Sequence, residues 1–179
     1  TNALPLLVNA LLWGVTIWIP YLNIGTTIGL FSGVIAKAGR GEQISYTEVF
    51  NPEYRKYMGN YFLVIGLMSM GIIAATAFFV VPGIVLAIAW SLGVLFVVDK
   101  GESPLEALNH SNEATYGKKW TIFGGLLVLG IIVMIVSGII SAIGMKIPVI
   151  GFLLPLIAMA LSASVMITAQ GHIYNTLAE

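Results

Sequence analysis

The sequence predicts an all-α polytopic membrane protein with six transmembrane helices and two short cytoplasmic loop helices. Of its 179 residues, 58% are hydrophobic and only 9% are charged, whereas a soluble domain carries about 25% charged residues. The apolar residues form charge-free runs, and about 20 such residues are enough to cross a membrane. The charges are collected between these runs. We therefore expect one membrane domain over residues 1–179.

The first charge-free run, residues 1–36, is too long for a single crossing. Pro20 and Asn23 interrupt it with residue types that favour turns. The run therefore predicts two spans, at about 3–18 and 22–38. No basic leader precedes the apolar residues, so we expect no cleavable signal peptide.

The second run, residues 57–98, contains Pro82-Gly83. Proline is tolerated in the first turn of a helix, because the hydrogen bond it cannot donate is missing there anyway. The run therefore predicts spans at about 59–80 and 82–98.

The remaining runs predict the last two spans, at about 120–144 and 153–176. Pro148, Gly151 and Pro155 stand at the start of the last run. An irregular entry near 147–155 is acceptable only at the membrane interface or buried within protein.

The basic residues orient the chain. Seven of the eight fall in two loops, and Lys146 alone falls on the other side. Positive residues favour the cytoplasmic side, so we expect both loops and both termini in the cytoplasm. The seven are Lys37, Arg40, Arg55, Lys56, Lys100, Lys118 and Lys119.

The two loops resemble each other, which predicts an internal repeat of 30–66 with 90–124. Arg40-Gly41-Glu42 corresponds to Lys100-Gly101-Glu102, and Ser45-x-x-Glu48 to Ser103-x-x-Glu106. Each Ser-x-x-Glu is a capping box, in which the serine and the glutamate satisfy free amides at a helix start. Ser45, Glu48, Ser103 and Glu106 are therefore predicted caps of two loop helices.

The sequence offers little for catalysis or metal binding. There is no cysteine, and the two histidines, His110 and His172, stand far apart in the chain, which makes a metal site weak. An enzyme would need a group such as Glu106, His110 and Glu113, but a solvent-facing His110 is the simpler interpretation. We predict no enzyme, no catalytic residue, no metal and no cofactor.

Two sets of residues are candidates for other roles. Gln170, His172 and Asn175 lie near the end of the last span, as interfacial residues or as the polar lining of a cytoplasm-facing cavity. Arg55, Lys56, Lys118 and Lys119 flank membrane entries. One interpretation is that these residues only set the topology. The other is that they also attract anionic lipid headgroups, with a binding free energy of about 1 kcal/mol per residue.

Glycines within the spans predict close helix contacts, within the chain or between copies. The expected partners are membrane lipids and either a second copy or another membrane protein, and no nucleic acid. The glycines are Gly66, Gly71, Gly83, Gly93, Gly124, Gly125, Gly130, Gly138 and Gly144.

One pattern in the chain runs from Pro82-Gly83-Ile84 through Asp99, Ser103-Pro104-Leu105-Glu106-Ala107-Leu108 and Ser111 to Gly117-Lys118-Lys119-Trp120. This pattern resembles a group of bacterial six-span proteins. The group includes the membrane domain attached to some glycerophosphoryl diester phosphodiesterases and uncharacterised relatives. The resemblance implies an all-helical protein of the cytoplasmic membrane. The phosphodiesterase activity belongs to a separate soluble domain, so no catalytic residue carries over. Asn109 stands where the group's pattern has a basic residue.

The sequence thus favours a non-enzymatic accessory or scaffold protein that acts through helix packing and its cytoplasmic loop helices. The alternative is a small permease or lipid-handling protein with a cavity between the repeats.

Overall fold

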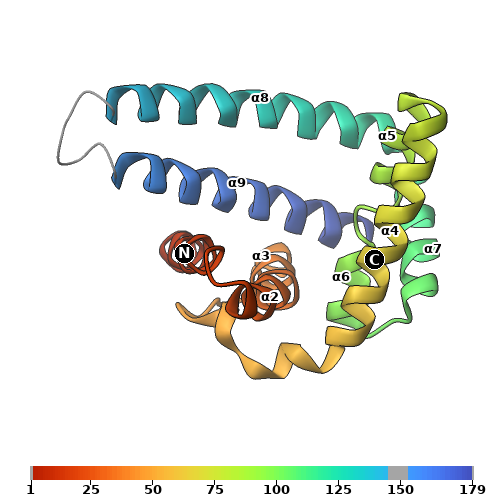
Figure 1. Cartoon of the computed structure of the whole chain (residues 1–179), viewed down its shortest axis with the longest axis horizontal. Coiled ribbons are helices and arrows are strands. Elements are labelled where there is room, and N and C mark those ends of the chain that lie inside the picture. Colours follow the sequence, from red (N-terminus) through yellow and green to blue (C-terminus); the bar gives the residue numbers. More distant parts are fainter. Residues whose placement is uncertain (1, 145–152, 179) are drawn as a thin grey trace.

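The computed structural model describes residues 2–144 and 153–178, which form helices and no β-strand (Figure 1). The irregular entry predicted near 147–155 and the side of Lys146 fall wholly or mostly outside the described residues. The elements are α1 (Ala3–Thr16), α2 (Pro20–Gly29), the π-helix η1 (Leu30–Ile35), α3 (Ala36–Arg40), the 3-10 helices η2 (Glu48–Phe50) and η3 (Pro52–Tyr57), α4 (Met58–Phe78), α5 (Val80–Ala89), α6 (Gly93–Leu95), the π-helix η4 (Phe96–Lys100), α7 (Pro104–Ala114), α8 (Lys119–Gly144) and α9 (Leu153–Leu177).

Four helical stretches are long and apolar enough to cross a membrane: Pro52–Phe78, Val80–Lys100, Lys119–Ile143 and Leu153–Leu177. They fall on the third to sixth predicted spans. The first predicted span falls on the shorter apolar helix α1, and the second falls on the consecutive helices α2, η1 and α3. The apolar helices indicate a membrane protein, while six crossings stay a prediction.

Prolines and extended residues set the helix boundaries. Pro20 is the first residue of α2, and Ile19 before it is extended, with φ −118° and ψ 93°; the residue before a proline avoids the helical conformation. Phe79 is extended as well, with φ −155° and ψ 143°, and it separates α4 from α5. The break therefore comes before the predicted one at Pro82. Pro82 lies in the first turn of α5, where its missing amide costs nothing.

In the first loop, the short helix that its capping box predicts is not a regular α-helix. It forms two 3-10 helices, η2 and η3, separated by Asn51. Pro52 explains the difference, because it disfavours the helical conformation at the preceding residue, and Asn51 has ψ 118°. Half of the capping box survives: the Glu48 carboxylate accepts a hydrogen bond from the Ser45 amide at 3.0 Å.

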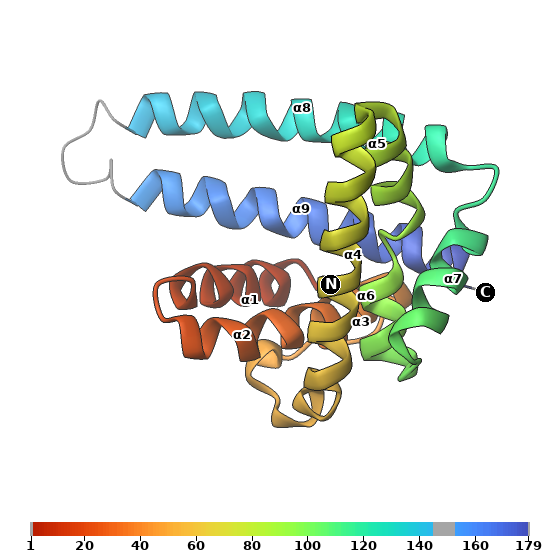
Figure 2. The same ribbon diagram turned by 45° about the vertical axis from the view of Figure 1, so that its right-hand side comes forward.

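The helices form three pairs that run in three directions. In Figure 1, α8 and α9 lie across the view, while α4 and α5 stand upright beside their right-hand ends. Helices α1 and α2 are seen nearly end-on there and lengthwise in Figure 2. The pairs therefore do not form one parallel bundle.

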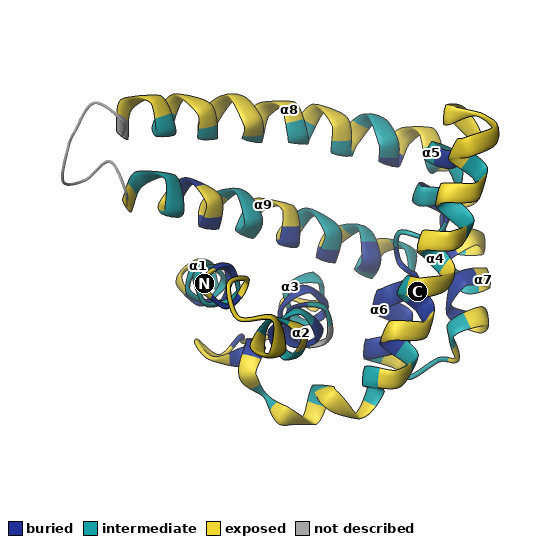
Figure 3. Cartoon of the chain, in the orientation of Figure 1, coloured by how far each residue is buried: buried dark blue, intermediate teal, exposed yellow. Residues whose placement is uncertain are grey.

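Helix α9 lies at the centre of the arrangement and packs against α1, α3 and α8. Buried residues gather where α9, α3 and α6 come together, whereas α8 is mostly exposed (Figure 3). No residue in the most apolar 18-residue stretch of α8 is buried. The hydrophobic core is thus concentrated at one end of the α8–α9 pair.

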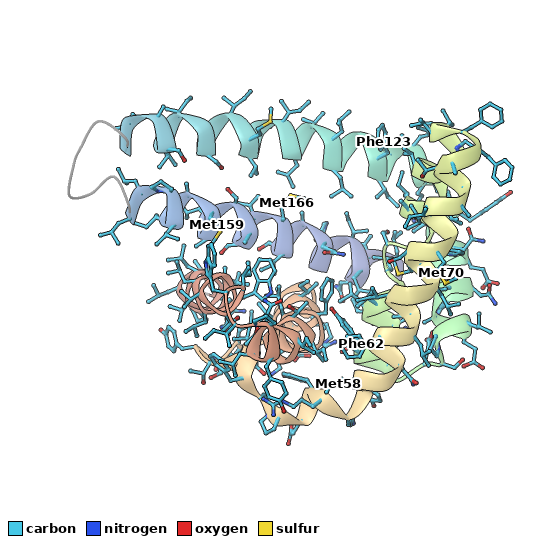
Figure 4. The ribbon with its side chains drawn as sticks, viewed as in Figure 1. Met58, Phe62, Met70, Phe123, Met159 and Met166 are labelled. Atoms are coloured by element: carbon cyan, nitrogen blue, oxygen red, sulfur yellow. The ribbon has the colours of Figure 1, made fainter. Side chains whose placement is uncertain are left out.

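Small residues let the backbones of α9 and its neighbours approach closely. A Cβ added to Gly171 of α9 would lie 2.7 Å from the carbonyl oxygen of Ile35 and 2.9 Å from the amide nitrogen of Gly39. Further along α9, the methyl group of Met159 fills the space beside Gly14 of α1 (Figure 4). Glycine at these positions is what allows α1 and α3 to pack on α9.

We expect Gly171→Ala to destabilise the protein, because both neighbours of the new methyl group are backbone atoms that cannot rotate away. Overpacking of this kind costs about 1–3 kcal/mol. The matched control is Gly66→Ala in α4, where an added Cβ meets nothing within 4 Å. Thermal unfolding in detergent micelles measures both. Equal melting temperatures for the two variants would contradict the close contact between α3 and α9.

Candidate functional site

Asp99 joins three helices at the loop end of the fold. One guanidinium nitrogen of Arg40, Nη1, donates to both Asp99 carboxylate oxygens at 2.8 Å. The hydroxyl of Tyr174 donates to Oδ2 at 2.9 Å. These three residues come from α3, η4 and α9, which are far apart in the chain. Charge-assisted hydrogen bonds are the strong ones, so this polar joint, as we call Arg40, Asp99 and Tyr174, holds the three helix ends together.

The joint extends into both loops. Arg40 Nε lies 2.5 Å from Glu42 Oε1, and this hydrogen bond holds the pKa of the Glu42 carboxyl below its usual value. The Lys100 ammonium donates to the carbonyl oxygen of Ala178 at 2.8 Å, which fixes the end of α9. Gly41 and Gly101 end the helices before the loops with φ 69° and 72°, the left-handed conformation that glycine favours at such ends.

The sequence favours a solvent-facing His110, but in the structure the His110 ring packs against aromatic residues beside the polar joint. The His110 ring stacks on the fully buried Phe96, with 4.0 Å between centroids, and Tyr174 meets the same Phe96 ring edge-on. His110 Nδ1 lies 2.9 Å from Glu102 Oε1. His110 is therefore a packing residue between α7 and η4, half covered by its neighbours.

Glu48 organises the first loop. Its buried carboxylate accepts hydrogen bonds from the Lys37 ammonium at 2.9 Å, from the Tyr54 hydroxyl and from the Ser45 amide. Burial raises the pKa of the Glu48 carboxyl, but these hydrogen bonds outweigh burial and hold the pKa below its ordinary value. Asn9 of α1 clamps the same loop, because its amide donates to Ser45 O at 2.7 Å and accepts from the Val49 amide at 3.1 Å.

The second loop keeps the predicted helix. Helix α7 begins after Ser103, and the Glu106 carboxylate accepts from the Ser103 amide at 3.3 Å. The buried Ser111 on α7 bridges the break between α5 and α6: its hydroxyl donates to Ala89 O at 2.7 Å and accepts from the Leu92 amide at 3.1 Å. Ser111 thus satisfies backbone groups that the broken helix leaves free.

The polar residues predicted near the end of α9 do not line one cavity. Gln170 Nε2 reaches Ser91 O, in the break between α5 and α6, at 3.5 Å. His172 is exposed in a groove beside α8, and Asn175 is partly buried. Among the described residues, no three or more histidine, cysteine, aspartate or glutamate side chains are grouped to hold a metal ion.

The predicted basic residues differ in their surroundings. Arg55 and Lys56 are exposed on η3, and the Lys56 ammonium lies 4.6 Å from the centre of the Tyr57 ring. Lys119 Nζ donates to Asn112 Oδ1 at 2.7 Å. Lys118 instead lines a groove of about 340 Å³ between α8 and α9. A second groove, of about 550 Å³, lies between α1 and the α8–α9 pair and shares Leu129, Ala169 and His172 with the first.

Sequence reasoning did not single out the polar joint. The sequence marks Asp99 only as part of the stretch that carries the family resemblance, and nothing in it distinguishes Tyr174. One feature of the sequence could have predicted the joint. Arg40 and Asp99 carry opposite charges at the ends of two apolar helices, and the basic residues predict that both ends lie on the same side of the membrane.

Comparison with protein families, with characterised proteins and with solved structures finds no match for this chain. The resemblance to the membrane domain of glycerophosphoryl diester phosphodiesterases therefore stays a prediction.

Glu48 gives a pH-dependent test of the first loop. A carboxyl whose pKa is lower in the folded state stabilises the fold above its unfolded pKa, near the ordinary value of 4.5, and loses this contribution as the pH falls further. We expect Glu48→Gln to cost about 1–3 kcal/mol at pH 7 and the difference from the unsubstituted chain to shrink below that pKa. Unfolding in micelles at several pH values measures this. Glu53→Gln, at an exposed carboxylate of the same loop, is the control. A difference independent of pH would contradict the assigned role of Glu48.

Proposed function

We propose that this chain is a non-enzymatic scaffold or accessory protein of a bacterial cytoplasmic membrane. Its helix pairs anchor it in the membrane, and its two loops form a fixed cytoplasmic face. The observation that supports this proposal is the polar joint. The polar groups of Arg40, Asp99 and Tyr174 hydrogen-bond to one another and hold the helix ends together. A loop face fixed in this way presents a defined surface to a partner at low entropic cost.

The six-span topology is supported by helix length and charge. Helices α2, η1 and α3 together cover residues 20–40 without a gap, which is enough for a crossing. Helix α1, with 14 residues, covers only about 21 Å and needs its flanking residues to complete a span. Six crossings also require the three helix pairs to lie closer to one common direction in a bilayer than they do in Figures 1 and 2.

The proposed repeat of 30–66 with 90–124 is supported by matched local geometry. Gly41 and Gly101 adopt the same left-handed conformation. Glu48 and Glu106 each accept a hydrogen bond from the amide of the serine three residues before. The two loops then diverge at Pro52, which has no counterpart in α7.

The face of α8 that points away from α9 is where we place the partner. Gly124 and Gly138 lie on this face, and an added Cβ at either one meets nothing within 4 Å. Val128, Ile131 and Ile135 lie between them at helical spacing and are exposed. Small residues beside branched apolar ones suit close packing of membrane helices, so the expected partner is a transmembrane helix of another membrane protein.

Photo-cross-linking in native membranes tests the scaffold. A photoreactive side chain at Ile131 should give a protein adduct of one defined mass, because Ile131 lies on the free face of α8. The same side chain at Leu129, which lines the grooves beside α9, is the matched control and should give no such adduct. The adduct should persist in Gln170→Ala and His172→Ala variants. Adducts with lipid alone at Ile131 would contradict the scaffold proposal.

A further inference from the structure

The groove between α8 and α9 has one polar end and one apolar end. Lys118, just before α8, and Thr121 in its first turn line the groove together with His172 and Thr176 from the last turns of α9. Further along the pair, the groove is lined by apolar or small residues such as Leu126, Leu129 and Ala169. Both ends belong to one space of about 340 Å³, which is within the range of ligand sites.

Glycine widens this groove. Gly125 lines it from α8, and an added Cβ there meets nothing within 4 Å. Facing small residues usually bring membrane helices into close contact. Here Gly125 and Ala169 instead leave space between α8 and α9, so the groove continues past the polar end into the apolar part of the pair.

The polar end has the chemistry of an anion site. Lys118 brings an ammonium group, Thr121 a hydroxyl and His172 an imidazole, while the Thr176 hydroxyl already donates to the His172 carbonyl oxygen at 2.7 Å. No aspartate or glutamate is among the described residues that line the groove. Trp120, exposed at the start of α8, is a residue type that marks the level of lipid headgroups.

We propose that this groove binds one anionic glycerophospholipid, with its phosphate at Lys118 and His172 and an acyl chain along Gly125 and Leu129. The positive charge of Lys118 favours an anionic headgroup, and the apolar walls of the groove contact the acyl chain. The site goes beyond the scaffold role. It uses the face of α8 toward α9, whereas the proposed partner face, with Gly124 and Ile131, points away.

The test uses the full chain in a neutral detergent, with native mass spectrometry to count bound lipid. The probes are dioleoylphosphatidylglycerol, which is anionic, and dioleoylphosphatidylcholine, which is zwitterionic. We expect the anionic lipid to bind preferentially, at one molecule per chain. Lys118→Gln should weaken its binding about fivefold, as loss of one basic residue near a headgroup does.

Two matched controls locate the site. Lys119→Gln removes the same charge next to the groove, and Gly124→Leu adds the same bulk on the other face of α8; both should leave binding within about twofold. Gly125→Leu fills the groove and should weaken binding roughly tenfold or more. Circular dichroism and gel filtration check the fold of each variant.

Three results would overturn the site. Equal losses in Lys118→Gln and Lys119→Gln would mean diffuse attraction to the surface. Equal binding of the two lipids would remove the headgroup preference. A Gly125→Leu variant that binds lipid normally but changes from dimer to monomer would mean that a second copy of the chain fills the groove.

Discussion

The fold depends on one carboxylate with donors from two other helices. Asp99 accepts hydrogen bonds from Arg40 and from Tyr174, and only 17% of its side chain is exposed. A partly buried charge is costly unless it is paired and hydrogen-bonded. Without Arg40, Asp99 would be left without an opposing charge in this joint. The chain therefore has a strong physical reason to bring the ends of α3, η4 and α9 together.

This constraint explains the uneven distribution of burial. The polar joint, the aromatic packing of Phe96 and the Gly39–Gly171 contact all lie at the loop end of the molecule. Away from it, α8 touches little besides α9 and leaves both faces available. One face borders the groove for which we propose a lipid, and the other carries the exposed glycines at which we propose a partner helix. An exposed apolar helix is stable in a bilayer, because lipid tails are as apolar as the side chains of another helix.

Much of the local structure could be predicted from the sequence, because it depends on neighbouring residues. Charge-free length predicted the apolar helices that fall on the last four predicted spans, and Ser103-x-x-Glu106 with Pro104 predicted the start of α7. In the first loop the predicted short helix appears only as the 3-10 helices η2 and η3, because Pro52 keeps Asn51 out of the helical conformation. Tertiary contacts were out of reach: nothing local shows that Ser111 would bridge a break in the preceding helix, or that Gln170 and His172 would face different neighbours.

The most direct measurement is one-sided labelling of single cysteines in sealed vesicles, because the chain has no cysteine of its own. Gln43→Cys and Glu113→Cys place a label in each loop, and Phe79→Cys places one between α4 and α5. The polar joint predicts that the two loop labels react from the same face, and the six-span topology puts Phe79 on the opposite one. Loop labels that react from opposite faces would rule out the Arg40–Asp99 contact and the account built on it.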